Sequence, residues 1–415
     1  MNSAIVEVWV CRTLIFFTLA ALSLQANADT TWLQGIAKQL NAHPKIIAAE
    51  ETVRQHKALV DGNSKAVYNP SLSADYSREG SYNNYIIGLS QTIDLHDKRA
   101  NLKQEALLNL IVAEKQLAAL RQTMFAQILS GFITLKKVES SLKLADEELE
   151  RLQRLAERIR SQRRSGEETR TGEDLSILNQ VRQLSMVALA KQAKIEAQLS
   201  LSVLLPDWQG TYEKMPQDIW QDVDNLLVSA PLTDSQNNPD VRIAKAQWLL
   251  SKQGILVSES AAGQDPTIGI STGKNGGATV YGLNFAMPLA VRNDYSANVR
   301  AAVSTSIGME ALYKDAILRA REAVIAASKN TAVYKAALKE WQSLTYEREK
   351  RLAEDLKILL EGGDITLTEY ITSLEQRAAA LQAGIDIEAE YHLQLVNWLA
   401  ISGLTESMQN NYTFP

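Results

Sequence analysis

Cysteine is almost missing from this sequence. The only one among 415 residues is Cys11, which precedes an apolar stretch at 13–24 that has the length of a signal-peptide core. Ala26–Ala28 then forms an A-x-A cleavage site, so we predict a secretory signal peptide over 1–28 and a mature chain that begins at Asp29. A mature chain without thiols can form neither disulfides nor thiolate metal sites, and it has no cysteine nucleophile.

Long apolar runs, basic blocks and catalytic motifs are missing as well. Beyond the signal, no run approaches the ~18 residues of a membrane helix, so an exported chain would be periplasmic, secreted or an outer-membrane β-barrel. The formal net charge is −5 without a basic block, which argues against a nucleic acid partner. The 4 histidines show no metal-ligand spacing and no nucleophile or phosphate-binding motif is present. We therefore predict that the chain is not an enzyme and that it holds no cofactor and no metal ion.

Two local clusters resemble sites but have simpler interpretations. Gly273–Gly277 is glycine-rich, yet it lies between two predicted strands and reads as a hairpin turn rather than a phosphate cradle. His96 lies beside Asp94 and Asp97, which is the best metal cluster in the sequence. It falls where a strand meets a helix, so we expect Asp97 to cap that helix instead.

Proline is absent from two long tracts, 71–205 and the region after Pro288 up to Phe414. Since an internal proline costs a helix ~3 kcal/mol, these tracts can hold long uninterrupted helices. The first is rich in strong helix formers, and its apolar residues recur about every seven positions, which is typical of coiled-coil packing. A helix over 97–164 would be roughly 100 Å long. The expected helices are 97–164, 171–205, 294–361 and 366–404.

Short motifs recur along the chain at an offset of roughly 195 residues. Tyr68–Pro70 corresponds to Gln264–Pro266, and Thr171–Asp174 corresponds to Thr366–Glu369. We therefore predict a duplicated unit of helix, two strands, long helix and helix. Its boundaries are 29–205 and 239–404, with an irregular equatorial segment at 206–238 and a C-terminal tail at 405–415.

The expected strands are 70–78, 84–93, 266–272 and 278–288. Their side chains alternate between apolar and small or polar, which is the pattern of transmembrane barrels but also of any half-buried sheet. In a membrane a sheet must close, and barrels need at least eight strands. Two chains would supply eight strands and three would supply twelve, enough to leave a lumen.

Several motifs in repeated order carry a family resemblance: GLSQTIDLHDKR at 88–99, GGDITLTEYITSLEQ at 362–376, and the Asn-Pro pairs at 69–70 and 238–239. With the duplication, they resemble the outer-membrane efflux (TolC) family over essentially the whole mature chain. The resemblance implies a mostly α fold with a small β part: a homotrimer with a twelve-stranded β-barrel in outer-membrane lipid, continuous with a long periplasmic α-helical barrel. Many members carry a lipidated cysteine where this chain has Asp29, so we expect no lipid anchor.

The same resemblance implies a function. The chain would be the passive exit duct of a tripartite efflux system, together with a periplasmic adaptor (membrane fusion) protein and an inner-membrane transporter of the RND type. The short chain and tail most resemble the metal-efflux branch. A drug efflux or type I secretion duct stays open, as does a soluble periplasmic coiled-coil scaffold. Four strands per chain disfavour a self-sufficient porin.

The two helix–helix turns are the candidate site. Glycine stops and capping-box-like restarts explain them as plain turns. In the resembled family, however, these turns form the periplasmic mouth, where a ring of carboxylates would attract cations. The pore constriction candidates are Glu369 and its proposed counterpart Asp174. We expect weak exposed ion pairs among Arg163, Arg164, Glu167 and Glu168 to hold the mouth shut. The candidate tip and adaptor contacts are Arg163, Arg164, Ser165, Gly166, Glu167, Gly362, Gly363 and Asp364.

Overall fold

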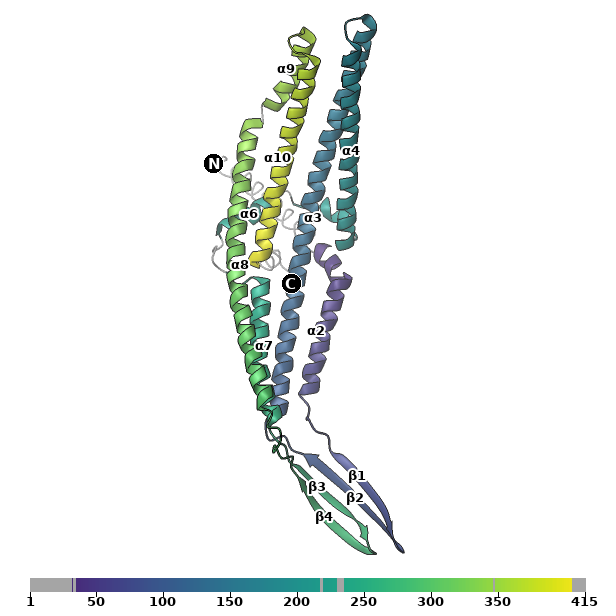
Figure 1. The fold of residues 1–415 in the computed structure, drawn as a ribbon, viewed down its shortest axis with the longest axis vertical. Helices are drawn as coiled ribbons and strands as arrows, with labels where there is room; N and C mark the ends of the chain where they lie inside the picture. The colour runs from purple at the N-terminus through teal and green to yellow at the C-terminus, as the bar shows by residue number, and fades with distance from the viewer. Residues whose placement is uncertain (1–31, 33–34, 217–218, 230–234, 346–347, 405–415) are drawn as a thin grey trace, which may run out of the picture. The chain divides into compact units, whose positions relative to one another are not determined.

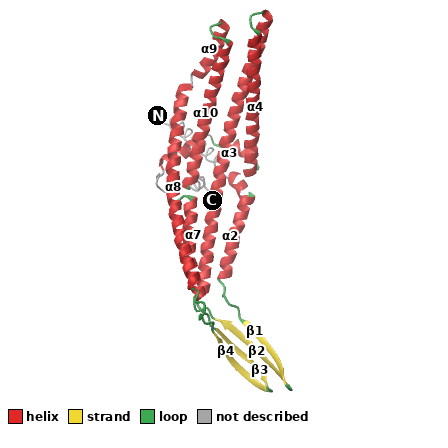
Figure 2. Cartoon of the chain, in the orientation of Figure 1, coloured by secondary structure: helices red, strands yellow, loops and turns green. Residues whose placement is uncertain are grey.

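The computed structural model describes residues 32, 35–216, 219–229, 235–345 and 348–404. The predicted signal peptide and C-terminal tail lie outside these residues. The described chain is mostly helical with one small sheet (Figures 1 and 2). It divides into two compact units: unit 1 comprises 1–43, 121–234 and 321–415, and unit 2 comprises 44–120 and 235–320. Among the described helices, none combines the length and apolarity needed to cross a membrane.

Unit 2 contains the sheet, in which four antiparallel strands lie in the order β1-β2-β3-β4. Two strands form each hairpin, and each hairpin closes through a short turn, Gly80-Ser81 and Gly276-Gly277. Gly276 and Gly277 have φ of 58° and 84°, the left-handed conformation that two-residue hairpin turns require. The strands are β1 (Ser71–Glu79), β2 (Tyr82–Thr92), β3 (Thr267–Asn275) and β4 (Ala278–Ala286).

The helices of unit 2 lead into and out of these hairpins. α2 (Pro44–Asn63) precedes β1, and α7 (Pro239–Ala262) precedes β3. Asn238 caps α7 by accepting hydrogen bonds from the backbone N–H groups of residues 240 and 241, with proline at the first helical position. Val241 packs with two alanines of α8 (Ser296–Thr345), which begins in this unit.

Unit 1 contains the two long helix pairs. The first pair is the 68-residue α3 (Lys98–Ser165), which also begins in unit 2, and α4 (Arg170–Leu204). The second consists of the remainder of α8 with α9 (Arg348–Gly362), followed by α10 (Leu367–Ser402). We expected one helix over 294–361; the structure describes helix on both sides of residues 346–347, which lie outside the described residues, so an uninterrupted helix stays a prediction.

The segment between the halves is more ordered than the sequence suggested. We expected 206–238 to be irregular, but it contains α5 (Trp208–Tyr212) and α6 (Ile219–Ser229). Ile219 and Val223 are buried one helical turn apart, which gives α6 an apolar side to pack. The ring of Trp220 stacks on His392 of α10, with centroids 4.8 Å apart.

Unit 1 also buries an ion pair. Glu148 of α3 and Arg377 of α10 are 5% and 8% exposed, and their charged atoms are 2.7 Å apart. Arg151 approaches the other carboxylate oxygen at 3.4 Å. A buried charge is tolerated only with such partners, so this contact fixes the register of α10 against α3.

Candidate functional site at the two helix–helix turns

Both turns stop their first helix with the same backbone motif. Gly166 follows α3 with φ 84°, and Gly363 follows α9 with φ 77°. In the first turn the N–H groups of residues 166 and 167 donate to the carbonyls of residues 163 and 162. In the second, those of residues 363 and 364 donate to 360 and 359. This is the Schellman motif, in which only glycine avoids strain at the left-handed position.

The two turns restart the chain differently. Thr366 and Glu369 form a complete capping box: the threonine hydroxyl accepts from the Glu369 N–H, and the Glu369 carboxylate accepts from the Thr366 N–H at 2.8 Å. In the first turn the N-cap is Thr169, whose hydroxyl accepts from the Gly172 N–H at 3.0 Å. The sequence-based expectation of a start at Thr171 was wrong by two residues, because Thr169 already supplies the cap.

This shift changes the correspondence between the two turns. When the N-caps Thr169 and Thr366 are matched, the residue opposite Glu369 is Gly172. Asp174, which we took as the counterpart of Glu369, falls opposite Ile371 instead. Asp174 is exposed, and no hydrogen bond or ion pair within the described chain joins it to Glu369. As pore-lining residues both stay predictions.

The expected ion pairs at the first turn involve a different acid. Arg163 contacts Glu173, and the Arg160 Nε donates to the same carboxylate at 3.4 Å. The hydrogen bond from Arg163 holds the pKa of Glu173 below its ordinary value. Glu168 instead accepts hydrogen bonds from the N–H and hydroxyl of Thr169.

The carboxylate of Glu369 is occupied by its capping role. It accepts from both the backbone N–H and the hydroxyl of Thr366, each at 2.8 Å. The backbone hydrogen bond is the main reason why the pKa of Glu369 lies below its ordinary value. The side chain is exposed and charged at neutral pH, so it can still act electrostatically on a passing ion.

An apolar cluster packs the two helix pairs together behind the turns. Tyr370 and Ile371, in the first turns of α10, lie in this cluster, and Arg158 of α3 also reaches Glu361 of α9 at 2.6 Å. The buried members are Leu152, Leu155, Ile159, Leu356, Tyr370, Ile371 and Leu374.

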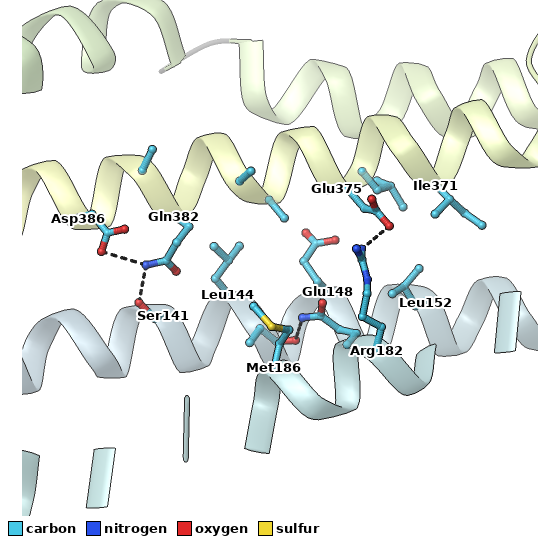
Figure 3. A pocket seen from close by; sticks show the side chains of 16 residues that line it. Ser141, Leu144, Glu148, Leu152, Arg182, Met186, Ile371, Glu375, Gln382 and Asp386 are labelled. Atoms are coloured by element: carbon cyan, nitrogen blue, oxygen red, sulfur yellow. Dashed lines mark hydrogen bonds and ion pairs between the residues drawn. The ribbon is translucent and has the colours of Figure 1, made fainter. Parts of the chain in front are cut away.

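A groove of about 590 Å³ continues from this cluster between α3, α4 and α10 (Figure 3). An ion pair between Arg182 and Glu375 crosses it near one end. At the other end Gln382 donates to Ser141 at 2.9 Å and to Asp386 at 3.2 Å. We did not predict this groove from the sequence. Its signal is the set of small residues on one face of α10, namely Ala378, Ala379 and Ala383.

A second polar cluster lies where strands meet helices in unit 2. Asp265, two residues before β3, has a side chain only 2% exposed. Its carboxylate accepts from Lys98 at 2.8 Å, from His96 at 3.0 Å and from Tyr68 at 2.9 Å. The backbone N–H of Leu95 adds a fourth bond at 3.1 Å. Burial by itself raises the pKa of Asp265, but the side-chain hydrogen bonds outweigh it and hold the pKa well below the ordinary value.

The expected roles near His96 need correction. The cap of α3 is Asp94, whose carboxylate accepts from the N–H groups of Lys98 and Arg99. Asp97 holds the N-cap position, since its carbonyl accepts from the N–H of Asn101, but among the described residues its side chain makes no capping hydrogen bond, and its φ of 54° is left-handed rather than extended. Within the described part of the chain, no group of three or more His, Cys, Asp or Glu residues could hold a metal ion.

The sheet presents two chemically different faces. The register places Leu72, Leu89, Ile270 and Leu283 in one row across all strands. On the opposite face, Ser73, Gly88, Ser271 and Gly282 form the matching row. The apolar side chains are open to the surroundings, and Leu283 is 86% exposed. The large exposed residues of the apolar face are Leu72, Tyr76, Tyr85, Ile87, Leu89, Ile268, Ile270, Tyr281, Leu283 and Phe285.

Helix α4 is apolar on two sides, of which one is covered. Ser176, Val187 and Leu201 mark its buried side. Exposed apolar residues follow a helical stripe on the other side, and no described element covers them. They are Leu178, Val181, Leu184, Ile195, Leu199 and Val203.

Comparison with solved structures identifies this architecture. The outer-membrane channel OprN matches with a TM-score of 0.74 and 15% identity over 91% of each chain. The outer membrane protein VceC of Vibrio cholerae matches with a TM-score of 0.73 and 12% identity over 90% of this chain and 96% of its own. The chain has the fold of the TolC family of outer-membrane efflux channels. CusC matches at a similar level, with a TM-score of 0.72 and 14% identity over 90% of this chain and 92% of its own. The shared fold therefore does not distinguish metal efflux from drug efflux. No family model and no curated protein sequence matches the chain.

Proposed function

We propose that the chain is one subunit of a trimeric, passive exit duct of a tripartite efflux system in the outer membrane. Three copies of the sheet would supply a twelve-stranded barrel, and the helices would form the periplasmic part. The chain would bind no cofactor and catalyse no reaction. An adaptor protein and an inner-membrane transporter, of the RND type, would be its partners.

The observation that carries this proposal is the exposed apolar face of the sheet. A water-soluble sheet covers its apolar face with helices or a second sheet, whereas here large residues on all four strands are open. Apolar side chains on the outer face and small or polar side chains on the inner face are the pattern of a barrel wall in lipid. The glycines on that other side allow close packing: a Cβ on Gly273 would lie 1.9 Å from the carbonyl oxygen of Tyr85.

Assembly from several copies is supported by what one chain leaves open. Among the described residues, the outer strands β1 and β4 each have one edge without a partner strand, and unpaired edges are not tolerated in lipid. The exposed apolar stripe of α4 likewise requires a partner helix. A second and third copy would cover both features.

The two turns are proposed as the periplasmic mouth and the adaptor contact. The first turn is held mainly by contacts within its own helix pair, and Arg158–Glu361 is one of the exposed ion pairs that link it to the second pair. Exposed contacts of this kind are weak, which suits a mouth that must open. Glu369, and with less support Asp174, would line the constriction.

The transported cargo is the most detailed part of the proposal. We favour metal ions, as the family resemblance of the sequence does and as fits CusC among the similar structures; drug efflux or type I secretion by the same fold is the alternative. Deletion of the gene should then sensitise cells to transition metals more than to dyes and antibiotics. The opposite pattern of sensitivity would reassign the cargo and leave the duct itself intact.

The decisive test contrasts lipid with water around the sheet. Leu283→Arg places a charge on the apolar face, and Ser77→Arg places it on the polar face. In a barrel wall the first change should cost about 2–4 kcal/mol and deplete the protein from outer membranes, while the second should be tolerated. In a soluble coiled-coil scaffold Leu283 faces water, so Leu283→Arg would be harmless and the wild-type chain would stay in the aqueous fraction. Membrane fractionation and heat-dependent gel mobility measure the difference.

A further inference from the structure

We infer that the apolar face of the sheet ends in a site for lipid phosphate, formed by Arg78 of β1 and Lys274 of β3 near the hairpin turns. The ligand is an anionic, phosphate-bearing lipid of the outer leaflet. The inference rests on the proposed function, which puts the apolar face in lipid and the hairpin turns at the external surface. It adds the residues through which the sheet contacts lipid headgroups.

The charged residues of the strands separate by sign between the two faces of the sheet. Both acids, Asp75 and Glu79, lie on the polar face, and both bases, Arg78 and Lys274, lie on the apolar face. A sheet in water gains from opposite charges placed side by side across strands, and this sheet does not use that arrangement. Bases alone on the face toward lipid suit a wall that meets anionic headgroups.

Both bases lie close to the hairpin turns, at the end of the sheet away from the helices. Arg78 pairs with Asn83 beside the first turn, and Lys274 pairs with Tyr85 close to the second. Tyr85 in turn pairs with Tyr76 of β1. Along the apolar face the side chains therefore change from aliphatic to tyrosine and then to basic toward the turns. This order is typical of the passage from membrane interior to interface.

The distance along β1 agrees with the depth of the headgroups. Arg78 lies six residues beyond Leu72, which is about 20 Å along the strand and about 15 Å along the membrane normal at the tilt of barrel strands. The apolar band of such a barrel is about 25 Å tall, so half of it is shorter than this distance. With the row of Leu72 at mid-depth, Arg78 reaches the headgroups. Lys274 lies one pleat deeper, and its flexible stem can extend along the apolar surface to the same level.

Both cations are available to a ligand. Arg78 and Lys274 are exposed, and neither side chain forms a hydrogen bond or an ion pair with the described residues. Next to Arg78, the Tyr76 hydroxyl donates to the side-chain oxygen of Asn83 at 3.1 Å, so these two polar groups satisfy each other. A guanidinium can donate two parallel hydrogen bonds to one phosphate, and an ammonium attracts it as a point charge.

The spacing of the two cations indicates more than one phosphate group. Two strand spacings sideways and two pleats' residues along the strands put the Cα atoms of Arg78 and Lys274 roughly 12 Å apart. A single phosphate does not bridge that separation without bending both side chains inward over the apolar face. The pair therefore suits a glycolipid that carries several phosphates.

Binding of lipopolysaccharide, a glycolipid with several phosphates, to the purified full-length oligomer in neutral detergent tests the inference. Arg78→Gln with Lys274→Gln removes both cations and keeps long polar side chains. The matched control is Lys57→Gln with Lys65→Gln, which removes two exposed lysines on the helix side of β1. The attraction of one basic residue to an anionic lipid surface predicts roughly fivefold weaker binding for each change and roughly 25-fold for the 78/274 pair. The control pair should bind like the wild type.

The source of the phosphate is distinguished by two further arms. Dephosphorylated lipopolysaccharide should bind the wild type as weakly as intact lipopolysaccharide binds the 78/274 variant. Undiminished binding of the dephosphorylated lipid would overturn the inference. Competition by inorganic phosphate at equal concentration would also overturn it, because the site would then hold a free anion and not a lipid headgroup.

The failure of this inference can be told apart from failure of the duct proposal. Wild-type affinity in the 78/274 variant, or an equal loss in the control pair, would overturn the lipid site while an oligomer in the membrane keeps the duct. A salt titration of the wild type needs no variant: binding should weaken as salt rises, and binding that is independent of salt would overturn the lipid site. A wild-type chain that stays in the aqueous fraction would contradict both proposals.

Discussion

Asp265 at the strand–helix junction and Arg163 at the first helix turn both form ion pairs, but in opposite settings. The Asp265 side chain is 2% exposed and its partner Lys98 is 14% exposed. Arg163 is 45% exposed, so its contact with Glu173 is open to water and salt on the arginine side, although the Glu173 side chain itself is only 12% exposed. Four hydrogen bonds converge on the buried Asp265 carboxylate. At the second helix turn, by contrast, the exposed Glu369 carboxylate takes part in one capping box with Thr366.

The difference indicates where this chain is built to be rigid. A buried charge that loses its partner is strongly destabilising, so the junction has one arrangement that is much better than any other. Exposed pairs are separable at small cost, so the turns have several arrangements of similar free energy. Each prediction below exchanges, removes or titrates one of these charges, from the largest expected effect to the smallest.

Arg377→Met should have the largest effect. It leaves Glu148 buried with only the longer contact to Arg151, and we expect a loss of about 3–5 kcal/mol in the free energy of unfolding. Thermal unfolding in detergent measures it. Arg182→Met is the matched control because the Arg182–Glu375 pair is exposed, and it should cost less than about 1 kcal/mol. Adding Glu148→Gln to Arg377→Met should recover much of the loss; no recovery would contradict the charge explanation.

Asp265→Asn should cost about 2–4 kcal/mol, because Lys98 loses its ionic partner in a mostly buried setting. The double change with Lys98→Met should recover part of this. The folded-state pKa of Asp265 is depressed, so its stabilisation is complete above the ordinary value of 3.8 and is lost as the pH falls below it. Wild type should therefore lose stability on acidification below about pH 4 more steeply than Asp265→Asn. Parallel pH profiles for the two proteins would exclude this role.

These two buried pairs mark the limit of sequence-based reasoning here. Periodicity and the absence of proline predicted the long helices, and alternation predicted the strands, because both depend on local patterns. Glu148 and Arg377 are far apart in the chain, and no local pattern announces that they meet. The cap of α4 was misplaced because Thr169 and Thr171 are both good caps, and only the backbone decides between them. The amphipathic helix α6 was missed because it lies in a segment bounded by prolines.

Glu369 allows charge and capping to be separated. Glu369→Gln keeps a side-chain oxygen for the capping box and removes the charge, whereas Glu369→Ala removes both. If Glu369 lines the constriction, both variants should reduce cation block and cation selectivity in planar bilayers to the same degree. Only Glu369→Ala should also lower the melting temperature. Wild-type cation block in both variants would remove Glu369 from the pore, and an effect of Glu369→Ala alone would assign it to helix capping only.

Arg163→Ala should have the smallest effect on stability, because its partner Glu173 keeps the contact with Arg160 and both arginines are well exposed. Its effect should instead appear in the opening of the mouth, as a higher mean conductance or more frequent open events in bilayers. The reverse pair, Arg163→Glu with Glu173→Arg, restores attraction and should return the wild-type pattern.

High salt should reproduce the effect of Arg163→Ala in the wild type, since screening weakens exposed pairs and leaves Asp265 and Glu148 largely untouched. A mouth that opens equally in low and high salt would show that packing in the apolar cluster behind the turns, and not charge, keeps it closed.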